Sequence, residues 1–426
     1  MGIRVSFLPL LAKADGCSRG RLPAIAAAML GLFLATGAAA AGPAPDGAFV
    51  TGRYRNLFAD LLGRTDAEVD AKVQAAWQQL FYGRDDTERL YYPVGTDEAY
   101  IADVGNHDVR SEGMSYGMMI AVQLDRRAEF DRLWKWARVH MYHTTGPRQG
   151  YFAWHCAFDG RQLDPGSASD GEEWFAMALF FADHRWGSGK GMFDYGAEAR
   201  ALLHAMLHQG SGRGGEVTSI FDRVHKQVVF APTLNASTFT DPSYHLPAFY
   251  ELWARWAGED GAFWSGAAAA SREFFHKAAN PLTGLMPERA GFDGQPHSVG
   301  GMGDFRFDAW RTLANVGLDH DWFGADPWDV LQSNRVLAFL TSKGAACPNQ
   351  FTLDGEALST DSSPGLNAMA AVAGLAAAPA LARPFVQRLW DASIPKGDWR
   401  YYDGMLYFLG VLEVSGRFKI YGPISR

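Results

Sequence analysis

The sequence predicts a single all-α domain, and its apolar pattern is the main reason. Apolar residues recur at helical spacing in about a dozen segments, whereas only Val228–Phe230 resembles a strand. No fixed period indicates a repeat solenoid, and no low-complexity linker divides the chain after residue 53. Helices that follow one another along a chain pack readily as antiparallel hairpins. We therefore expect residues 54–426 to form one domain of helical hairpins with long loops.

Several of the expected helices begin with recognisable capping signals. Thr65-Asp-Ala-Glu68 has the pattern of a capping box, and Ser169-Asp-Gly-Glu172 has the same pattern. Ser111 is expected to cap the helix that follows it. The expected helices cover residues 65–81, 111–124, 128–142, 169–184, 194–207, 243–256, 263–277, 307–318, 327–341, 364–377, 382–392 and 402–414.

The first 41 residues have the features of an export signal. Two arginines precede an apolar run from Leu22 to Ala35, and small residues follow as far as Ala41. We expect cleavage near Ala40 or Ala41, with residues 42–53 as a linker. The run is short for a membrane span, and no later stretch reaches about 18 consecutive apolar residues. The mature chain is therefore expected to be exported, periplasmic or secreted, and free of the membrane.

Composition favours an uncharged substrate. The net charge is −8 and no cluster of Lys and Arg stands out, which argues against binding to nucleic acid or to an anionic membrane. Aromatic residues make up 13% of the chain, and flat rings commonly bind the faces of sugars. Aromatic residues also fill protein cores, so this composition favours a carbohydrate ligand without requiring one.

Cysteine and histidine spacing predicts no metal site and no cofactor. Removal of the signal would leave Cys156 and Cys347, and whether they pair is open. No Cys-x-x-Cys spacing exists, and no third ligand in a zinc pattern follows His140 and His143.

Three carboxyl groups stand where expected helices begin, in segments rich in glycine and aromatic residues. They belong to Glu112, Asp170 and Asp308. Each also has a plain structural interpretation: Glu112 and Asp170 could be first-turn acids that interact with a helix dipole. Asp308 could form an i,i+3 ion pair with Arg311.

The surroundings of two of these carboxyls favour opposite protonation states. Glu112 is followed by Met114, Met118 and Met119, and an apolar environment favours the neutral carboxylic acid. Arg311 beside Asp308 favours the charged carboxylate. A protonated and an ionised carboxyl group are the general acid and the general base of glycoside hydrolysis.

Four segments of the chain carry a resemblance to a known family: Asp108–Met119, Gly150–Trp154, Ser169–Phe181 and Asp308–Asp319. Together they resemble glycoside hydrolase family 8 and, within it, the reducing-end xylose-releasing exo-oligoxylanases. The resemblance extends from about Tyr54 to Tyr407. It implies an (α/α)6 barrel of six helical hairpins with a substrate cleft at one end, and an inverting reaction on β-1,4 linkages.

The resemblance also implies a role for individual residues, and we expect each to hold in this chain. The expected roles are Glu112 as general acid, Asp308 as general base, Asp170 as the acid that holds the distorted sugar, Tyr244 as a residue that positions the attacking water, Trp154 as an aromatic platform and Arg311 as support for Asp308.

Two alternatives to exo action on xylo-oligosaccharides remain open. The chain could be an endo-acting β-1,4-xylanase or endoglucanase of the same family, or a noncatalytic sugar-binding protein on the same barrel. Exo action requires a loop that blocks the cleft, and the candidates are Lys343–Pro364 and residues 211–242. We expect a monomer.

Overall fold

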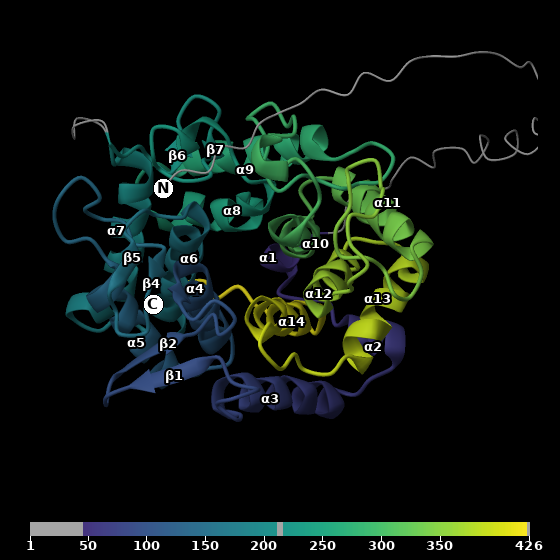
Figure 1. The fold of residues 1–426 in the computed structure, drawn as a ribbon, viewed down its shortest axis with the longest axis horizontal. Helices are drawn as coiled ribbons and strands as arrows, with labels where there is room; N and C mark the ends of the chain where they lie inside the picture. Colours follow the sequence, from purple (N-terminus) through teal and green to yellow (C-terminus); the bar gives the residue numbers. More distant parts are fainter. Residues whose placement is uncertain (1–45, 211–215, 424–426) are drawn as a thin grey trace, which may run out of the picture. The chain divides into compact units, whose positions relative to one another are not determined.

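Twelve helices of ten or more residues form two concentric rings in the computed structural model, which describes residues 46–210 and 216–423 (Figure 1). All twelve expected helices are present, as α3 to α14. The inner ring contains α4 (Ser111–Gln123), α6 (Ser169–Trp186), α8 (Pro247–Trp256), α10 (Arg311–Trp322), α12 (Pro364–Ala373) and α14 (Arg400–Val414). The outer ring contains α3 (Asp66–Tyr82), α5 (Arg127–Trp136), α7 (Tyr195–His208), α9 (Gly261–Ala278), α11 (Trp328–Ser342) and α13 (Pro379–Asp391).

The inner helices pack side by side and close into a ring. Contacts join α4 to α6, α8 to α10, α10 to α12, α12 to α14, and α14 back to α4. Between α6 and α8, the rings of Trp174 and Phe249 meet edge to face at 5.1 Å, and the Tyr250 hydroxyl donates to Glu173. Most residues of α4, α6, α10, α12 and α14 are buried, as expected of helices with neighbours on every side.

Each inner helix also packs against one outer helix. In five of the pairs the two helices are consecutive in the chain: α4 with α5, α6 with α7, α8 with α9, α10 with α11, and α12 with α13. The sixth joins α3 near the start of the chain to α14 near its end. This arrangement is an (α/α)6 barrel, which confirms the expected fold.

Short elements connect the helices. A strand, β7 (Gln227–Val228), includes the first residue of the expected run Val228–Phe230, but the expectation that no other segment forms a strand is wrong. The strands are β1 (Tyr91–Val94), β2 (Glu98–Ile101), β3 (Val109–Arg110), β4 (His155–Cys156), β5 (Gln162–Asp164), β6 (Phe221–Asp222) and β7 (Gln227–Val228). They form three small antiparallel sheets: β1–β2, β3–β4–β5 and β6–β7. Strands of two to four residues are too short to show an alternating pattern. The short helical turns are α2 (Leu57–Leu62), η1 (Ala137–Met141), η2 (Gly191–Phe193), η3 (Ala236–Thr238), η4 (Pro242–Tyr244), η5 (Val299–Gly301) and η6 (Phe307–Trp310).

The capping box at the start of α3 is confirmed. Thr65 Oγ1 accepts from the Glu68 backbone N–H at 3.3 Å, and Glu68 accepts from the Thr65 backbone N–H at 2.8 Å.

The expected caps at Ser111 and Ser169 are wrong. Each serine is the first residue inside its helix, and neither helix has a side-chain cap. A Cβ added to Gly171 would lie 2.4 Å from Ser111 Oγ, so the first turns of α4 and α6 touch there. Small residues at this contact bring Glu112 and Asp170, which follow the two serines, close together.

The expected export signal lies outside the described residues. Part of the expected linker is helical: α1 (Ala48–Thr51) packs against α10, with the Phe49 and Phe323 rings 5.2 Å apart. Among the described helices, none is long and apolar enough to cross a membrane.

The two cysteines of the described chain are not paired. Cys156 is a buried free thiol and Cys347 a partly buried one, and burial raises the pKa of both. His140 interacts with Glu98 and His143 with the Pro165 carbonyl.

Candidate active site

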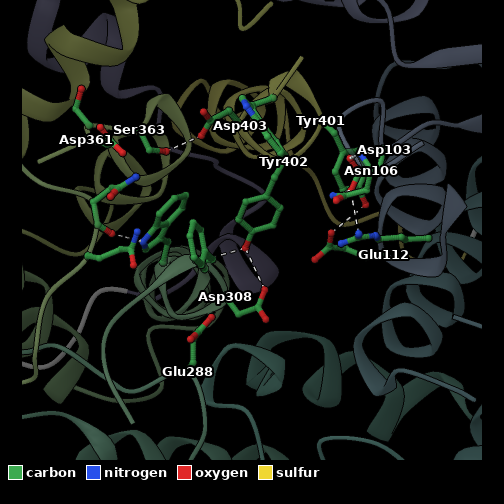
Figure 2. Close-up of a pocket in the computed structure, with 17 residues that line it drawn as sticks. Asp103, Asn106, Glu112, Glu288, Asp308, Asp361, Ser363, Tyr401, Tyr402 and Asp403 are labelled. Carbon is green, nitrogen blue, oxygen red and sulfur yellow. Dashed lines mark hydrogen bonds and ion pairs between the residues drawn. The ribbon is translucent and has the colours of Figure 1, made fainter. Parts of the chain in front are cut away.

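A cavity of about 690 Å³ opens where several inner helices begin (Figure 2). The starts of α4 and α14 and the turns before α10 and α12 form its wall, because the chain enters these inner helices at the same end of the barrel. Its lining residues are Asp103, Asn106, Arg110, Glu112, Glu288, Phe307, Asp308, Trp310, Asn349, Gln350, Asp361, Ser362, Ser363, Trp399, Tyr401, Tyr402 and Asp403.

Glu112 reaches the cavity from the first turn of α4, with its side chain only 16% exposed. Its Oε1 accepts from the Tyr401 hydroxyl at 2.9 Å, and its Oε2 lies 2.9 Å from Arg311 Nη1. Burial raises the pKa of Glu112 to about 7, and Asp170 and Asp308 add to the rise against the opposing effects of Arg311 and Tyr401. A carboxyl group with this pKa is protonated below neutral pH, as a general acid must be.

Gly113 allows Tyr401 to approach Glu112. A Cβ at Gly113 would lie 2.6 Å from the Tyr401 ring and hydroxyl, so any larger residue would displace the tyrosine. The absence of a side chain at Gly113 therefore allows the hydrogen bond between Tyr401 and Glu112 to form.

Arg311 brings the three predicted carboxyl groups together. Its Nη1 donates to Glu112 Oε2 at 2.9 Å and to Asp170 Oδ2 at 3.0 Å. Its Nη2 forms an ion pair with Asp308 Oδ1 at 2.9 Å. The Asp308–Arg311 pair is therefore present, but Arg311 is buried and shares its guanidinium with two further carboxyl groups, those of Glu112 and Asp170.

Asp170 and Asp308 differ in their access to water. Asp170, in the first turn of α6, is buried, and burial is the main cause of its raised pKa. The side chain of Asp308 is 35% exposed on η6, and its Oδ1 lies 3.4 Å from the Tyr402 hydroxyl. Asp308 is therefore the more accessible of the two to a water molecule in the cavity.

Tyr244 and Trp154 lie beside the cavity without lining it. Tyr244 is buried on η4, with its ring 5.4 Å from the Arg311 guanidinium carbon. Trp154 stacks on His155, and its carbonyl accepts from the Ser111 backbone N–H at 3.0 Å. Trp154 therefore lies next to the start of α4. The expected role of Tyr244 in positioning the attacking water and the expected role of Trp154 as an aromatic platform both stay predictions.

Among the cavity residues that were not anticipated from the sequence, four are of chemical interest. Tyr401 and Tyr402 contact the two carboxyls from α14, and Trp399 lines the cavity with 74% of its surface exposed. An exposed tryptophan in a polar cavity is suited to stacking on a sugar ring. Glu288 is the fourth: burial, with Asp308 next in effect, raises its pKa to about 7. For Tyr401 and Tyr402, the sequence feature that could have indicated a site is the pair of adjacent tyrosines at the start of an expected helix.

Over most of its length the chain is similar to known proteins. Residues 96–416 match the family described as glycosyl hydrolases family 8. The chain is 49% identical over 381 residues to the reducing-end xylose-releasing exo-oligoxylanase of Paenibacillus barcinonensis, covering 88% of this chain and 98% of that protein. It is 45% identical to the reducing-end xylose-releasing exo-oligoxylanase of Halalkalibacterium halodurans, covering 89% of this chain and 97% of that one.

A solved structure extends the similarity to three dimensions. A family 8 enzyme of Teredinibacter turnerae in complex with xylobiose superposes with a TM-score of 0.86 at 43% identity, covering 88% of this chain and all of that chain. The barrel, the cavity of carboxyl groups and these similarities together show that the chain belongs to glycosyl hydrolase family 8.

Proposed function

We propose that this enzyme hydrolyses β-1,4-linked xylo-oligosaccharides with inversion and releases xylose from the reducing end. The observation that carries the proposal is the near full-length similarity to two reducing-end xylose-releasing exo-oligoxylanases. The cavity supports it, because a buried acid and an accessible carboxylate open into one space.

In the proposed reaction, two carboxyl groups act on opposite sides of the sugar. Glu112 donates its proton to the glycosidic oxygen as the bond to the anomeric carbon breaks. Asp308 takes a proton from the water that attacks this carbon from the other face, so Glu112 ends ionised and Asp308 protonated. Asp170 hydrogen-bonds to hydroxyls of the distorted ring. Proton exchange with solvent then restores both carboxyls.

A loop before α12 supports exo action. Asn349, Gln350 and the segment Asp361–Ser363 line the cavity, all from the first candidate blocking loop. This loop is braced by hydrogen bonds from Trp310 Nε1 to the Asn349 carbonyl at 2.9 Å and from the Asn349 backbone N–H to the Asp361 carbonyl at 2.8 Å. Within the described part of residues 211–242, no residue lines the cavity. We therefore propose that the first loop, and not the second, ends the cleft.

Product analysis on xylohexaose tests the proposal. With a ¹³C label in the reducing-end sugar, the first products are expected to be labelled xylose and unlabelled xylopentaose. Proton NMR at early times should show the new reducing end as the α-anomer, because inversion at a β-linkage gives that anomer. Unlabelled early xylose, or a β-anomer, would contradict the proposal.

Endo action on xylan is the second candidate, since the Teredinibacter turnerae protein with bound xylohexaose is described as a xylanase and is 43% identical. Internal cleavage would give xylobiose to xylotetraose before free xylose. Cleavage of cellohexaose at a comparable rate would instead support an endoglucanase.

The basic limb of the kcat/KM profile is expected near pH 7, because Glu112 must be protonated and its pKa is about 7. The Tyr401 hydrogen bond lowers this pKa, so Tyr401→Phe should raise it and move the basic limb to higher pH. Initial rates on xylotriose between pH 4 and 9 would measure the shift.

Tyr402→Phe is the matched control for this experiment. It removes a neighbouring hydroxyl that contacts Asp308 and the Phe307 carbonyl, and it leaves the hydrogen bond to Glu112 in place. Its basic limb should stay near that of the parent enzyme. A larger alkaline shift in Tyr402→Phe than in Tyr401→Phe would show that another group sets this limb.

We also propose that the enzyme is exported and acts as a monomer. Support for export comes from the sequence of residues 1–41, whose structure is not described. Mass spectrometry of protein from the culture medium or periplasm would detect an N-terminus near Ala41 or Gly42. Light scattering would give the oligomeric state.

A further inference from the structure

Two histidines one turn apart on α7 face the loop between α8 and α9, outside the active-site cavity. The rings of His204 and His208 stack, with centroids 4.5 Å apart. His204 Nδ1 lies 2.5 Å from Glu259 Oε1, and His208 Nε2 lies 2.6 Å from Asp260 Oδ2. Four side chains with metal-binding atoms therefore meet at one place on the surface.

The spacing of these atoms is close to that of a metal site. One possible ligand atom each from His204, His208 and Glu259 lies within 4.8 Å of the other two. Zinc ligands at about 2.1 Å from a tetrahedral ion lie roughly 3.4 Å apart. The side chains of His204 and Glu259 are 56% and 60% exposed. Small rotations of these two side chains can therefore bring the ligand atoms to the shorter spacing that zinc requires.

The residue types suit a divalent transition metal. Two histidines at i and i+4 on one helix face are a recurring zinc-binding arrangement, and carboxylate oxygens complete such sites. Two adjacent carboxylates give the place an excess of negative charge that attracts a cation. Hard cations such as Mg²⁺ prefer oxygen ligands alone, so the histidines favour zinc, nickel or copper.

We propose that His204, His208 and Glu259 bind a divalent transition-metal ion of the zinc class, with water completing the coordination. The ion would take the place of the proton shared by His204 Nδ1 and Glu259 Oε1, and that imidazole proton would move to Nε2 of His204. His208 Nε2 would turn from Asp260 to the ion, and its proton would move to Nδ1. Because the histidines belong to α7 and the carboxylates to the loop before α9, the bound ion would tie these two elements together.

Arg223 provides a specific check on this arrangement. Its Nη1 lies 3.5 Å from His208 Nδ1, the nitrogen that would carry the proton once Nε2 binds the ion. A ligating histidine normally directs that N–H at an acceptor, and a guanidinium offers only donors and a positive charge. Arg223→Ala is therefore expected to tighten metal binding.

The alternative is that each histidine only forms a surface pair with its own carboxylate. Such pairs contribute little and need no ion. His225 is an example: it is exposed and contacts Asp222 at 2.7 Å, and it has no place in the cluster. His225→Ala is therefore a matched control.

Calorimetric titration of the tag-free protein with ZnCl₂ tests the proposal. One Zn²⁺ per chain is expected to bind and to raise the Tm. His204→Ala and His208→Ala should each weaken zinc binding by at least about tenfold. Replacing a residue that only hydrogen-bonds to a metal ligand already lowers metal affinity by about that factor, and the loss of a ligand should cost no less. Glu259→Gln should also weaken it, and His225→Ala should not. Co²⁺ bound to the parent protein should show the visible absorption of a four-coordinate site.

Two results would overturn the proposal: no saturable binding of Zn²⁺, Ni²⁺ or Cu²⁺, or equal affinity in the parent and a His204→Ala/His208→Ala double variant. All variants lie outside the cavity, so their hydrolysis of xylohexaose should match that of the parent. This comparison separates failure of the metal site from failure of the proposed function.

Discussion

Glu112→Gln is expected to lower kcat on xylotriose by about 100- to 10,000-fold, the usual contribution of a general acid. Glutamine keeps the size of the side chain, but its single oxygen can accept from only one of the two donors, Tyr401 or Arg311, and it has no proton with a suitable pKa to give. KM should change little, because the hydroxyl contacts of the substrate do not depend on this proton. Steady-state kinetics on purified protein of unchanged Tm would measure the loss.

The leaving group distinguishes the acid from the base. A 2,4-dinitrophenyl β-xylobioside releases a phenolate that needs no proton, so on this substrate Glu112→Gln should recover most of its lost rate. Asp308→Ala should lose activity on both substrates, because the water still has no base. Added azide, a nucleophile that needs no deprotonation, should partly restore Asp308→Ala and leave Glu112→Gln unchanged. Recovery of both variants on the aryl substrate would contradict the assignment of roles.

Much of the barrel could be predicted from the chain because its helices bury broad apolar faces. Burial imposes a helical spacing that is visible over ten or more residues. The β1–β2 hairpin was missed because four residues cannot show a period. The helix expected over 128–142 ends at Trp136 and continues as the π-helical turn η1, a change that apolar spacing does not reveal.

The site could be predicted only where its residues stand in recognisable motifs. Glu112 and Asp170 lie in the first turns of α4 and α6, and Asp308 lies in η6 directly before α10, so the barrel brings the three together. Tyr401 contacts Glu112 across 289 residues of sequence, so its role depends on the closure of the ring by α14. A single sequence does not show that two residues so far apart in the chain lie close together in space. The burial that sets the pKa of Glu112 likewise comes from the packed barrel.

Arg311→Met is expected to lower the free energy of unfolding by about 3–5 kcal/mol at pH 7 and to abolish hydrolysis. Loss of one partner of a buried ion pair leaves its counter-charges uncompensated, and Arg311 serves Glu112, Asp170 and Asp308 at once. Arg311 also lowers the pKa of Glu112 and of Asp170, so its removal raises both further.

The loss of stability in Arg311→Met should depend on pH. A carboxyl group whose pKa is higher in the folded than in the unfolded state stabilises the fold at low pH, and this stability is lost as pH rises through the folded pKa. The difference between Arg311→Met and the parent should therefore be larger at pH 8 than at pH 5. Urea unfolding followed by tryptophan fluorescence at both pH values would measure it.

Arg272→Met provides the matched control, because Arg272 is an arginine with the same kind of partners away from the cavity. It makes hydrogen bonds of 2.7 and 2.8 Å to Asp319 and one of 2.9 Å to Glu251. Its replacement should cost a comparable free energy of unfolding, yet the folded variant should keep the kcat and the basic limb of the parent. Equal losses of activity in the two variants at matched stability would mean that Arg311 holds the barrel together without preparing its carboxyls for catalysis. Loss of activity in Arg311→Met alone would show that the guanidinium also sets the charge of the reacting groups.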